Sequence, residues 1–174
     1  MLFSEEIYHG KAVRLRKDEV LLPSGRRTTR EVVEHPGSVG VVPLIQGGQI
    51  LLIRQFRLPT GRVIWEIPAG TLVSGETPEQ CARRELEEET GYRSRELELL
   101  FRSYLAPGYS MELMHFFVAR VLEKGEQRPE EDEIIGIEAF PVAKVLEMIG
   151  SGSIMDTKTI AATSFLIATG RIAP

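Results

Sequence analysis

Cysteine, long apolar runs and excess positive charge are all scarce in this sequence. The single Cys81 cannot form an internal disulfide, which favours a reducing compartment such as the cytoplasm. No apolar run approaches the ~20 residues of a membrane-spanning helix, and the opening MLFSEEIYHG lacks the basic and apolar regions of a signal peptide. A net charge of −4 gives no general attraction to nucleic acid or to an anionic membrane. We therefore expect a cytoplasmic protein that binds neither of them.

The remaining composition is that of an ordinary globular protein. The 174 residues suffice for one domain with a core, and contents of 43% hydrophobic and 26% charged residues are usual. Arginine outnumbers lysine 16 to 5, and the planar donors of arginine suit phosphate oxyanions. This bias is compatible with a phosphorylated ligand, but thermostability or genome composition would produce it equally well.

The pattern of the chain changes near residue 37. Short alternating runs at 12–16, 19–22 and 28–34, with a turn signal at Pro23-Ser24-Gly25, predict a small antiparallel sheet within residues 1–37. Such a sheet buries little, so it must pack on the main domain or on a second copy of the chain. Residues 38–174 predict strands at 38–45, 49–56, 63–67, 97–104, 113–122 and 134–140, and two final helices at 142–149 and 157–168. With one more helix between the strands, this order predicts an α+β fold with a mixed sheet sandwiched between helices.

That central helix lies within residues 70–92, GTLVSGETPEQCARRELEEETGY, and both of its ends are marked. Thr77 suits the N-cap, Pro78 the first helical position, and Gln80 completes the spacing of a capping box. Gly91 can adopt the left-handed conformation that ends a helix.

Three glutamates of this helix share one face. At 3.6 residues per turn, Glu85, Glu88 and Glu89 fall within an arc of about 100°. Ala82 and Leu86 border the arc, which places it at the edge of the buried face. Like charges at this spacing repel each other, so a half-buried cluster needs a cation, and hard carboxylate oxygens select Mg²⁺ or Mn²⁺. The alternative is a solvated acidic face.

The spacing of nine residues decides between these interpretations. Gly70 is followed after five residues by Glu76, after seven more by Arg84-Glu85-Leu86, and then by Glu88-Glu89 and Gly91-Tyr92 with one residue before each pair. Every fixed position of the Nudix box is matched, and the chain resembles a Nudix hydrolase. The resemblance implies the Nudix fold and a water attack on the phosphorus of a nucleoside diphosphate linked to another moiety. It also implies Mg²⁺ as the cofactor, with Mn²⁺ as the alternative.

The resemblance assigns the metal site to this box. Glu85 and Glu89 are the implied ligands, and Glu88 is a third carboxylate. The Ala69 carbonyl completes the site by the same resemblance.

Three further box residues are expected to support the metal site. Arg84 would orient the glutamates by ion pairing, the alternative being a surface pair with Glu88. Gly70 would allow a tight backbone path, the alternative being an ordinary turn glycine. Glu76 would orient the loop before the helix, the alternative being an interaction with the helix dipole.

One proline narrows the resemblance within the Nudix proteins. Pro107 stands 16 residues beyond Gly91, a spacing that marks the ADP-ribose pyrophosphatase group, although a turn proline before Gly108 is the alternative. The chain departs from that group in one respect. Its N-terminal segment offers only Phe3 and Tyr8 as aromatics that could stack on an adenine, which leaves base selectivity open.

Substrate contacts are implied by the same resemblance. Two arginine-rich segments, RRTTR and RQFR, are similar to the segments with which that group contacts its substrate. Arg27, reaching across a dimer, and Arg57 would face the phosphates or the terminal ribose, with solvated surface as the alternative for each. Glu66 would hydrogen-bond the adenine, and Glu112 would be a substrate-side carboxylate or a surface residue at a strand end.

An acidic loop, PEEDEI, sits where the group carries its catalytic loop. Glu131 matches the general base and Glu133 an additional metal contact. The register could slip by one residue, and acidic loops are common on protein surfaces. If no loop carboxylate matters, Glu88 is the next candidate for the base.

Taken together, the resemblance implies a homodimeric, Mg²⁺-dependent enzyme that splits ADP-ribose into AMP and ribose 5-phosphate. Its nearest alternative is the same chemistry on another nucleoside diphosphate sugar such as GDP-mannose. A ligand-sensing Nudix domain without turnover is disfavoured by the intact box. Hydrolysis of oxidised nucleoside triphosphates is disfavoured by Pro107 and by the N-terminal sheet.

Overall fold

The computed structural model describes residues 1–10, 13–127 and 136–173. They form two compact units. The first comprises Met1–Ser38 and Arg102–Met114, and the second comprises Val39–Phe101 and His115–Pro174. The sequence predicts a division into 1–37 and 38–174 and does not predict that residues 102–114 group with the N-terminal segment. The separate roles given to those two parts stay predictions.

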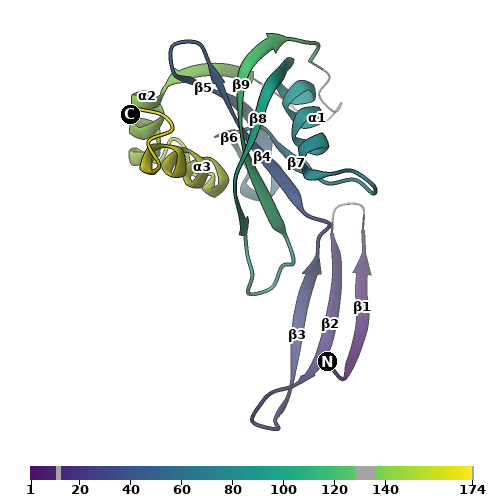
Figure 1. Cartoon of the computed structure of the whole chain (residues 1–174). Coiled ribbons are helices and arrows are strands. Elements are labelled where there is room, and N and C mark those ends of the chain that lie inside the picture. The colour runs from purple at the N-terminus through teal and green to yellow at the C-terminus, as the bar shows by residue number, and fades with distance from the viewer. Residues whose placement is uncertain (11–12, 128–135, 174) are drawn as a thin grey trace. The chain divides into compact units, whose positions relative to one another are not determined.

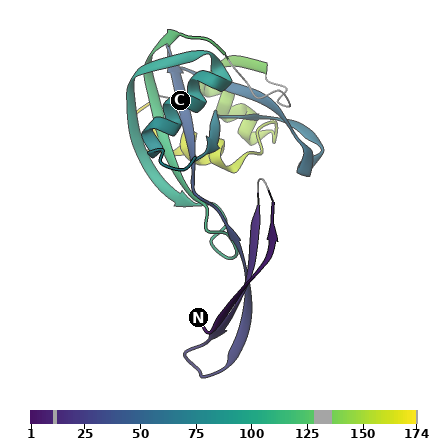
Figure 2. The same ribbon diagram turned by 90° about the vertical axis from the view of Figure 1, so that its right-hand side faces the viewer.

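The first unit is built on a three-stranded antiparallel sheet (Figure 2). Its strands are β1 (Phe3–His9), β2 (Arg14–Leu21) and β3 (Arg27–Glu34), in that order. The predicted small sheet is present, but β2 unites two predicted runs and β1 was not predicted. Residues 102–114 join through β3, since the Val33 N–H donates to the Tyr109 carbonyl at 2.7 Å and the Met111 N–H donates to the Val33 carbonyl at 3.0 Å.

A seven-stranded sheet forms the centre of the second unit. Its strands are β4 (Ser38–Ile45), β5 (Gln49–Arg57), β6 (Arg62–Glu66), β7 (Ala69–Thr71), β8 (Tyr92–Tyr104), β9 (Leu113–Lys124) and β10 (Gly136–Pro141). The main order is β10-β5-β4-β9-β8, while β6 pairs with β5 and β7 pairs with β4. A short 3₁₀ turn, Leu58–Thr60, separates β5 from β6.

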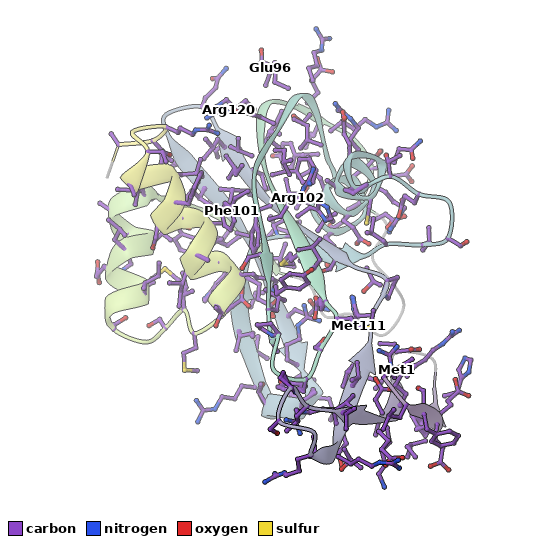
Figure 3. All side chains as sticks on the ribbon, turned by 60° about the horizontal axis from the view of Figure 1, so that its bottom comes forward. Met1, Glu96, Phe101, Arg102, Met111 and Arg120 are labelled. Atoms are coloured by element: carbon purple, nitrogen blue, oxygen red, sulfur yellow. The ribbon has the colours of Figure 1, made fainter. Side chains whose placement is uncertain are left out.

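In the described part of the chain, three helices cover the two faces of this sheet: α1 (Pro78–Thr90), α2 (Val142–Gly150) and α3 (Thr157–Ala168). Figure 1 shows α1 on one side and α2 with α3 on the other. Side chains of a strand alternate between its two faces, so two neighbouring residues of β9 pack against the two different helix layers. Phe117 packs in the core cluster of α1, whereas Phe116 stacks on Phe101, which also contacts Phe165 of α3. Phe101 is labelled in Figure 3. The predicted α+β fold, a mixed sheet sandwiched between helices, is confirmed.

Cys81 lies on the buried face of α1. It packs with Val39, Val41 and Leu86 in the core cluster. Burial raises the pKa of its thiol to about 12, so it remains protonated and serves as a packing residue. Within the described part of the chain, no helix is long and apolar enough to cross a membrane.

Candidate active site

The caps of α1 determine where this helix begins and ends, and therefore which of its side chains face the site. Thr77 is the N-cap, its hydroxyl accepts from the Gln80 N–H at 3.3 Å, and its own N–H donates to the Gln80 side chain at 2.9 Å. Pro78 begins the helix, and Gly91 ends it with φ 71° while donating to the Glu87 carbonyl at 2.8 Å. Both predicted helix ends are confirmed.

Arg84 of α1 forms hydrogen bonds with several glutamate side chains at once. Its Nε and Nη2 donate to the two carboxylate oxygens of Glu76 at 2.9 and 3.0 Å. Its Nη1 donates to Glu85 at 2.6 Å and to Glu88 at 3.0 Å. A surface pair with Glu88 alone does not account for three carboxylate partners.

The contact with Arg84 also sets the charge of Glu76. The hydrogen bonds from Arg84 lower the pKa of Glu76 from its ordinary value of 4.5 to about 2. The same pair raises the pKa of Arg84. Glu76 additionally accepts from the Val73 N–H at 3.3 Å, so it ties the loop before α1 to the helix.

The backbone at Ala69 and Gly70 passes directly over the helix. A Cβ at position 70 would lie 1.8 Å from Oε1 of Glu85, so no residue with a side chain fits while that carboxylate keeps its place. Gly70 has no positive φ, and close approach is therefore the reason for glycine here. The Ala69 N–H donates to Oε2 of the buried Glu89 at 2.9 Å.

The donor chemistry of this region fits a hard divalent cation. Glu85, Glu88 and Glu89 lie on one side of α1, and the Ala69 backbone lies against them. Among the described residues, no three acidic, histidine or cysteine side chains already converge as a complete metal site. The reason is visible in the contacts, since Arg84 binds Glu85 and Glu88 while Glu89 faces the Ala69 N–H. A guanidinium thus supplies the positive charge between two of the carboxylates.

Arg57 and Glu66 form a second charged site on the β5 and β6 hairpin. Arg57 donates from Nε to Oε1 of Glu66 at 2.8 Å and from Nη2 to Oε2 at 2.9 Å, and Lys158 of α3 also contacts Oε2. Burial raises the pKa of Glu66, but the hydrogen bonds from Arg57 and the charge of Lys158 outweigh it, so the net shift is downward. Both oxygens of Glu66 are engaged by these cations, and its contact with adenine stays a prediction.

Three predicted substrate residues belong to the first unit. Arg27 is 70% exposed and lies 3.5 Å from Glu19. Glu112 accepts from the Ser38 hydroxyl at 2.7 Å, and Pro107 lies in an exposed turn. Their roles stay predictions. Glu131 and Glu133 lie outside the described residues.

Two residues near the site carry no sequence signal that could have singled them out. Lys158 reaches Glu66 from 92 positions away, and the Gln127 side chain donates to the Glu89 carbonyl at 3.0 Å from 38 positions away. Lys158 stands in the first turn of α3 and Gln127 in an acidic stretch, where each would be taken for a solvated residue. Only tertiary packing brings them to the site.

The sandwiched sheet, and the glutamate-bearing helix under the Ala69 and Gly70 backbone, define a hydrolase domain of the Nudix class. Residues 34–157 match the family model described as NUDIX domain, and the chain belongs to this family. Hydrolases of this family generally need a divalent metal ion, in agreement with the oxygen donors of α1.

Several relatives resemble the chain over most of its length. An ADP-ribose pyrophosphatase of Bacillus subtilis (strain 168) is 40% identical over 164 residues, covering 93% of this chain and 89% of the relative. A methanol dehydrogenase activator of Bacillus methanolicus is 39% identical over 165 residues, covering 94% and 89%. A GDP-mannose pyrophosphatase of Yersinia enterocolitica is 38% identical over 122 residues, covering 65% and 63%.

One solved structure matches the fold of nearly the whole chain. It is described as the crystal structure of ADP compounds hydrolase, and it superposes with a TM-score of 0.86 over 98% of this chain and 95% of that chain. At 22% sequence identity, this likeness shows the fold alone.

Proposed function

We propose that the protein is a Mg²⁺-dependent Nudix pyrophosphohydrolase that converts ADP-ribose into AMP and ribose 5-phosphate. The observation that carries the proposal is that Arg84 binds three glutamates of the box, Glu76, Glu85 and Glu88, in a chain that aligns over 93% of its length with an ADP-ribose pyrophosphatase. An intact charged box is what turnover requires, and it disfavours a domain that only senses its ligand.

Glu85, Glu89 and Glu88, together with the Ala69 carbonyl, would hold the metal. Mg²⁺ is proposed because all these donors are hard oxygens, and Mn²⁺ would be accepted by the same set. A divalent ion at this place would neutralise pyrophosphate charge and acidify a bound water. Arg84 keeps two of the glutamates oriented, and Gly70 leaves the space that the Glu85 carboxylate occupies.

The remaining assigned residues would bind the substrate. Arg57 and Arg27 carry donors for the phosphates or the terminal ribose, and guanidinium groups match phosphate oxygens with paired donors. Glu66 is proposed to contact the adenine, and Glu112 and Pro107 to border the substrate. Arg27 would act in the partner's site, which requires a homodimer with residues 1–37 contributing to assembly and to substrate contacts. A cytoplasmic location agrees with the single buried cysteine.

Glu131 is proposed as the general base, with Glu133 contacting a metal. A positioned base contributes about two to four orders of magnitude in rate, so Glu131→Gln should lower kcat by that range while substrate affinity changes little. Turnover and substrate binding of the Gln variants at 130, 131 and 133 provide the measurement. A Glu131→Gln variant within a few-fold of wild type, beside a critical Glu130, Glu133 or Glu112, would show that the register is wrong. If none of these carboxylates affects turnover, Glu88 is the next candidate for the general base.

Hydrolysis of GDP-mannose is the second candidate, favoured by the similarity to a GDP-mannose pyrophosphatase over 65% of the chain. Relatives at about the same identity carry different names, so product analysis must decide the substrate. The experiment incubates the enzyme and Mg²⁺ with ADP-ribose, GDP-mannose, a dinucleoside polyphosphate and 8-oxo-dGTP. The wild-type enzyme should release AMP and ribose 5-phosphate from ADP-ribose faster than it cleaves the other three compounds. The Glu85→Gln variant should not release these products. The control Glu79→Gln removes an exposed helix carboxylate and should remain active. Faster release of GMP from GDP-mannose would contradict the ADP-ribose assignment.

A further inference from the structure

Four charged side chains form a connected cluster between the β5 and β6 hairpin and the start of α3. The side chains of Glu66, Lys158 and Asp156 are 1%, 12% and 13% exposed, respectively. Arg57, at 37%, is the one member that reaches solvent. The cluster therefore has a buried end on α3 and an exposed end at a guanidinium.

The strands determine how Arg57 meets Glu66. Glu66 pairs with Ile53 across the hairpin, and Arg57 lies four residues beyond Ile53 on the same strand face. The two long side chains meet along this face, where the planar fork of Arg57 binds both oxygens of Glu66, a bidentate geometry that fixes the direction of the guanidinium. Arg57 thus cannot rotate freely while Glu66 keeps its place.

The first turn of α3 keeps Glu66 in place. Asp156 caps this helix by accepting from the N–H and hydroxyl of Thr159 at 3.0 and 2.5 Å. Lys158 donates to Asp156 at 2.8 Å and also contacts Glu66. The Thr159 hydroxyl in turn accepts from the Ile67 N–H at 2.8 Å, which ties the residue after Glu66 to the same turn.

The chemistry of the exposed end of the cluster suits an anion. Arg57 and Lys158 carry two positive charges and Glu66 and Asp156 carry two negative charges, so the four groups are formally balanced. Glu66 and Asp156 lie at the buried end, whereas the guanidinium of Arg57 reaches solvent, and its planar donors match phosphate oxygens.

We propose that Lys158 is a positioning residue for substrate binding, which acts through Glu66 to hold Arg57 toward the phosphate groups of a nucleoside diphosphate sugar. This inference rests on the proposed function, in which Arg57 contacts the substrate. A lysine that only compensates a buried glutamate would affect stability but leave substrate affinity unchanged. The two roles therefore differ in a measurable way.

A double-mutant cycle on binding tests the proposal. The dissociation constant for ADP-ribose is measured by calorimetry in EDTA, where the metal site is empty and no hydrolysis occurs. Lys158→Met should weaken binding about tenfold, a factor that equals about 1.4 kcal/mol. In an Arg57→Met background the same change should weaken binding by clearly less than in the wild type, because the guanidinium through which Lys158 acts is gone and only the proposed contact of Glu66 with the adenine can still respond.

Two variants complete the design. Lys158→Arg keeps the positive charge and should restore most of the affinity. Lys144→Met removes a lysine of α2 that is paired with Glu147 on the surface, and it should leave binding unchanged. With Mg²⁺ present, Lys158→Met should raise KM about as much as it raises the dissociation constant, while kcat stays within about threefold.

Other outcomes overturn the proposal. An equal loss of affinity in the wild-type and Arg57→Met backgrounds, or no loss in either, shows that Lys158 does not act through Arg57. If Lys158→Met does not fold, Lys158→Gln carries the cycle, since it keeps a donor to Glu66 without the charge. If the wild type neither binds nor hydrolyses ADP-ribose, the proposed function fails, and the cycle is run with the nucleotide that the product analysis identifies.

Discussion

Arg84 and Gly70 both determine the position of one carboxylate, that of Glu85. Arg84 binds Glu85 with a short charged hydrogen bond, and the absence of a side chain at Gly70 leaves room for that carboxylate to sit against the backbone. Neither residue needs to touch a metal to determine where Glu85, a proposed metal ligand, lies. At the scale of residues, the site therefore depends as much on these supporting positions as on the glutamates.

Gly70→Ala should impair metal binding more than folding. The new Cβ would overlap Oε1 of Glu85, and the cheapest relief is rotation of that flexible side chain away from the site. We expect the Mg²⁺ concentration for half-maximal activity to rise by about 10- to 100-fold, the usual effect of disturbing the support of a ligand, with little change in Tm.

The control for this change is Gly150→Ala. Gly150 has open space around its would-be Cβ and no positive φ, so the substitution should be neutral. An unchanged Mg²⁺ requirement in Gly70→Ala would show that the Glu85 carboxylate is not displaced.

The ion pair of Glu76 with Arg84 predicts a loss of stability in acid. The pKa of Glu76 is lowered from 4.5 to about 2 in the folded protein, so its contribution is complete above pH 4.5 and disappears as the pH falls toward 2. The free energy of unfolding is measured by denaturant between pH 6 and pH 2 for wild type and Glu76→Gln. The difference between the two proteins should be largest near neutral pH and should shrink toward pH 2. Parallel curves would contradict the lowered pKa.

Helix α1 carries Arg84 and the three glutamates 85, 88 and 89 of the box, and its start is held by a reciprocal cap. Thr77 and Gln80 each satisfy a backbone N–H of the other, and these amides would otherwise lack partners. The cap thereby fixes the helical phase that places Arg84 opposite Glu76.

Thr77→Ala should lower the free energy of unfolding by about 1 kcal/mol, the typical value for loss of an N-cap. Equilibrium denaturation gives the measurement. Ser164→Ala in α3 is the matched control, because it removes an exposed mid-helix hydroxyl that caps nothing and places a better helix former there. Equal effects of the two substitutions would argue against a stabilising cap at Thr77.

At the scale of the whole molecule, the N-terminal sheet is the part that is least able to stand alone. All seven residues of β1 are exposed, including the apolar Phe3 and Ile7. β3 also pairs with residues 109 and 111, so removing it leaves those backbone groups without their partner strand. A sheet with this much exposed apolar surface suits contact with a second copy of the chain.

Deleting residues 1–35 should yield a monomer or an aggregate that hydrolyses little ADP-ribose. The reason is the combined loss of Arg27, of the proposed dimer contact and of the strand that pairs with residues 109 and 111. Light scattering and product analysis provide the measurements. Arg27→Ala in the full chain separates the two roles, since it should keep the assembly and raise KM. A fully active monomer after the deletion would refute a contribution across subunits.

Short-range signals made much of the fold predictable. The bounds of β4 and α3 and both ends of α1 agree with the prediction to the residue. Strand β1 was missed because its register shifts between Glu6 and Tyr8, which breaks the alternation on which a strand prediction depends. Strand β8 begins at Tyr92 rather than near residue 97, since it is an edge strand whose charged residues remain in solvent.

By itself, the sequence determined the family, the caps of α1 and the spacing that places Arg84 and three glutamates on one helical face. Capping and helical periodicity act between residues a few positions apart, so the linear order contains them. Tertiary structure alone decided that Gly70 lies against Glu85, that Lys158 supports Glu66 across 92 positions, and that residues 102–114 group with β3. Those contacts exist only after strands and helices pack, because packing selects their partners by shape and buried charge and not by distance along the chain.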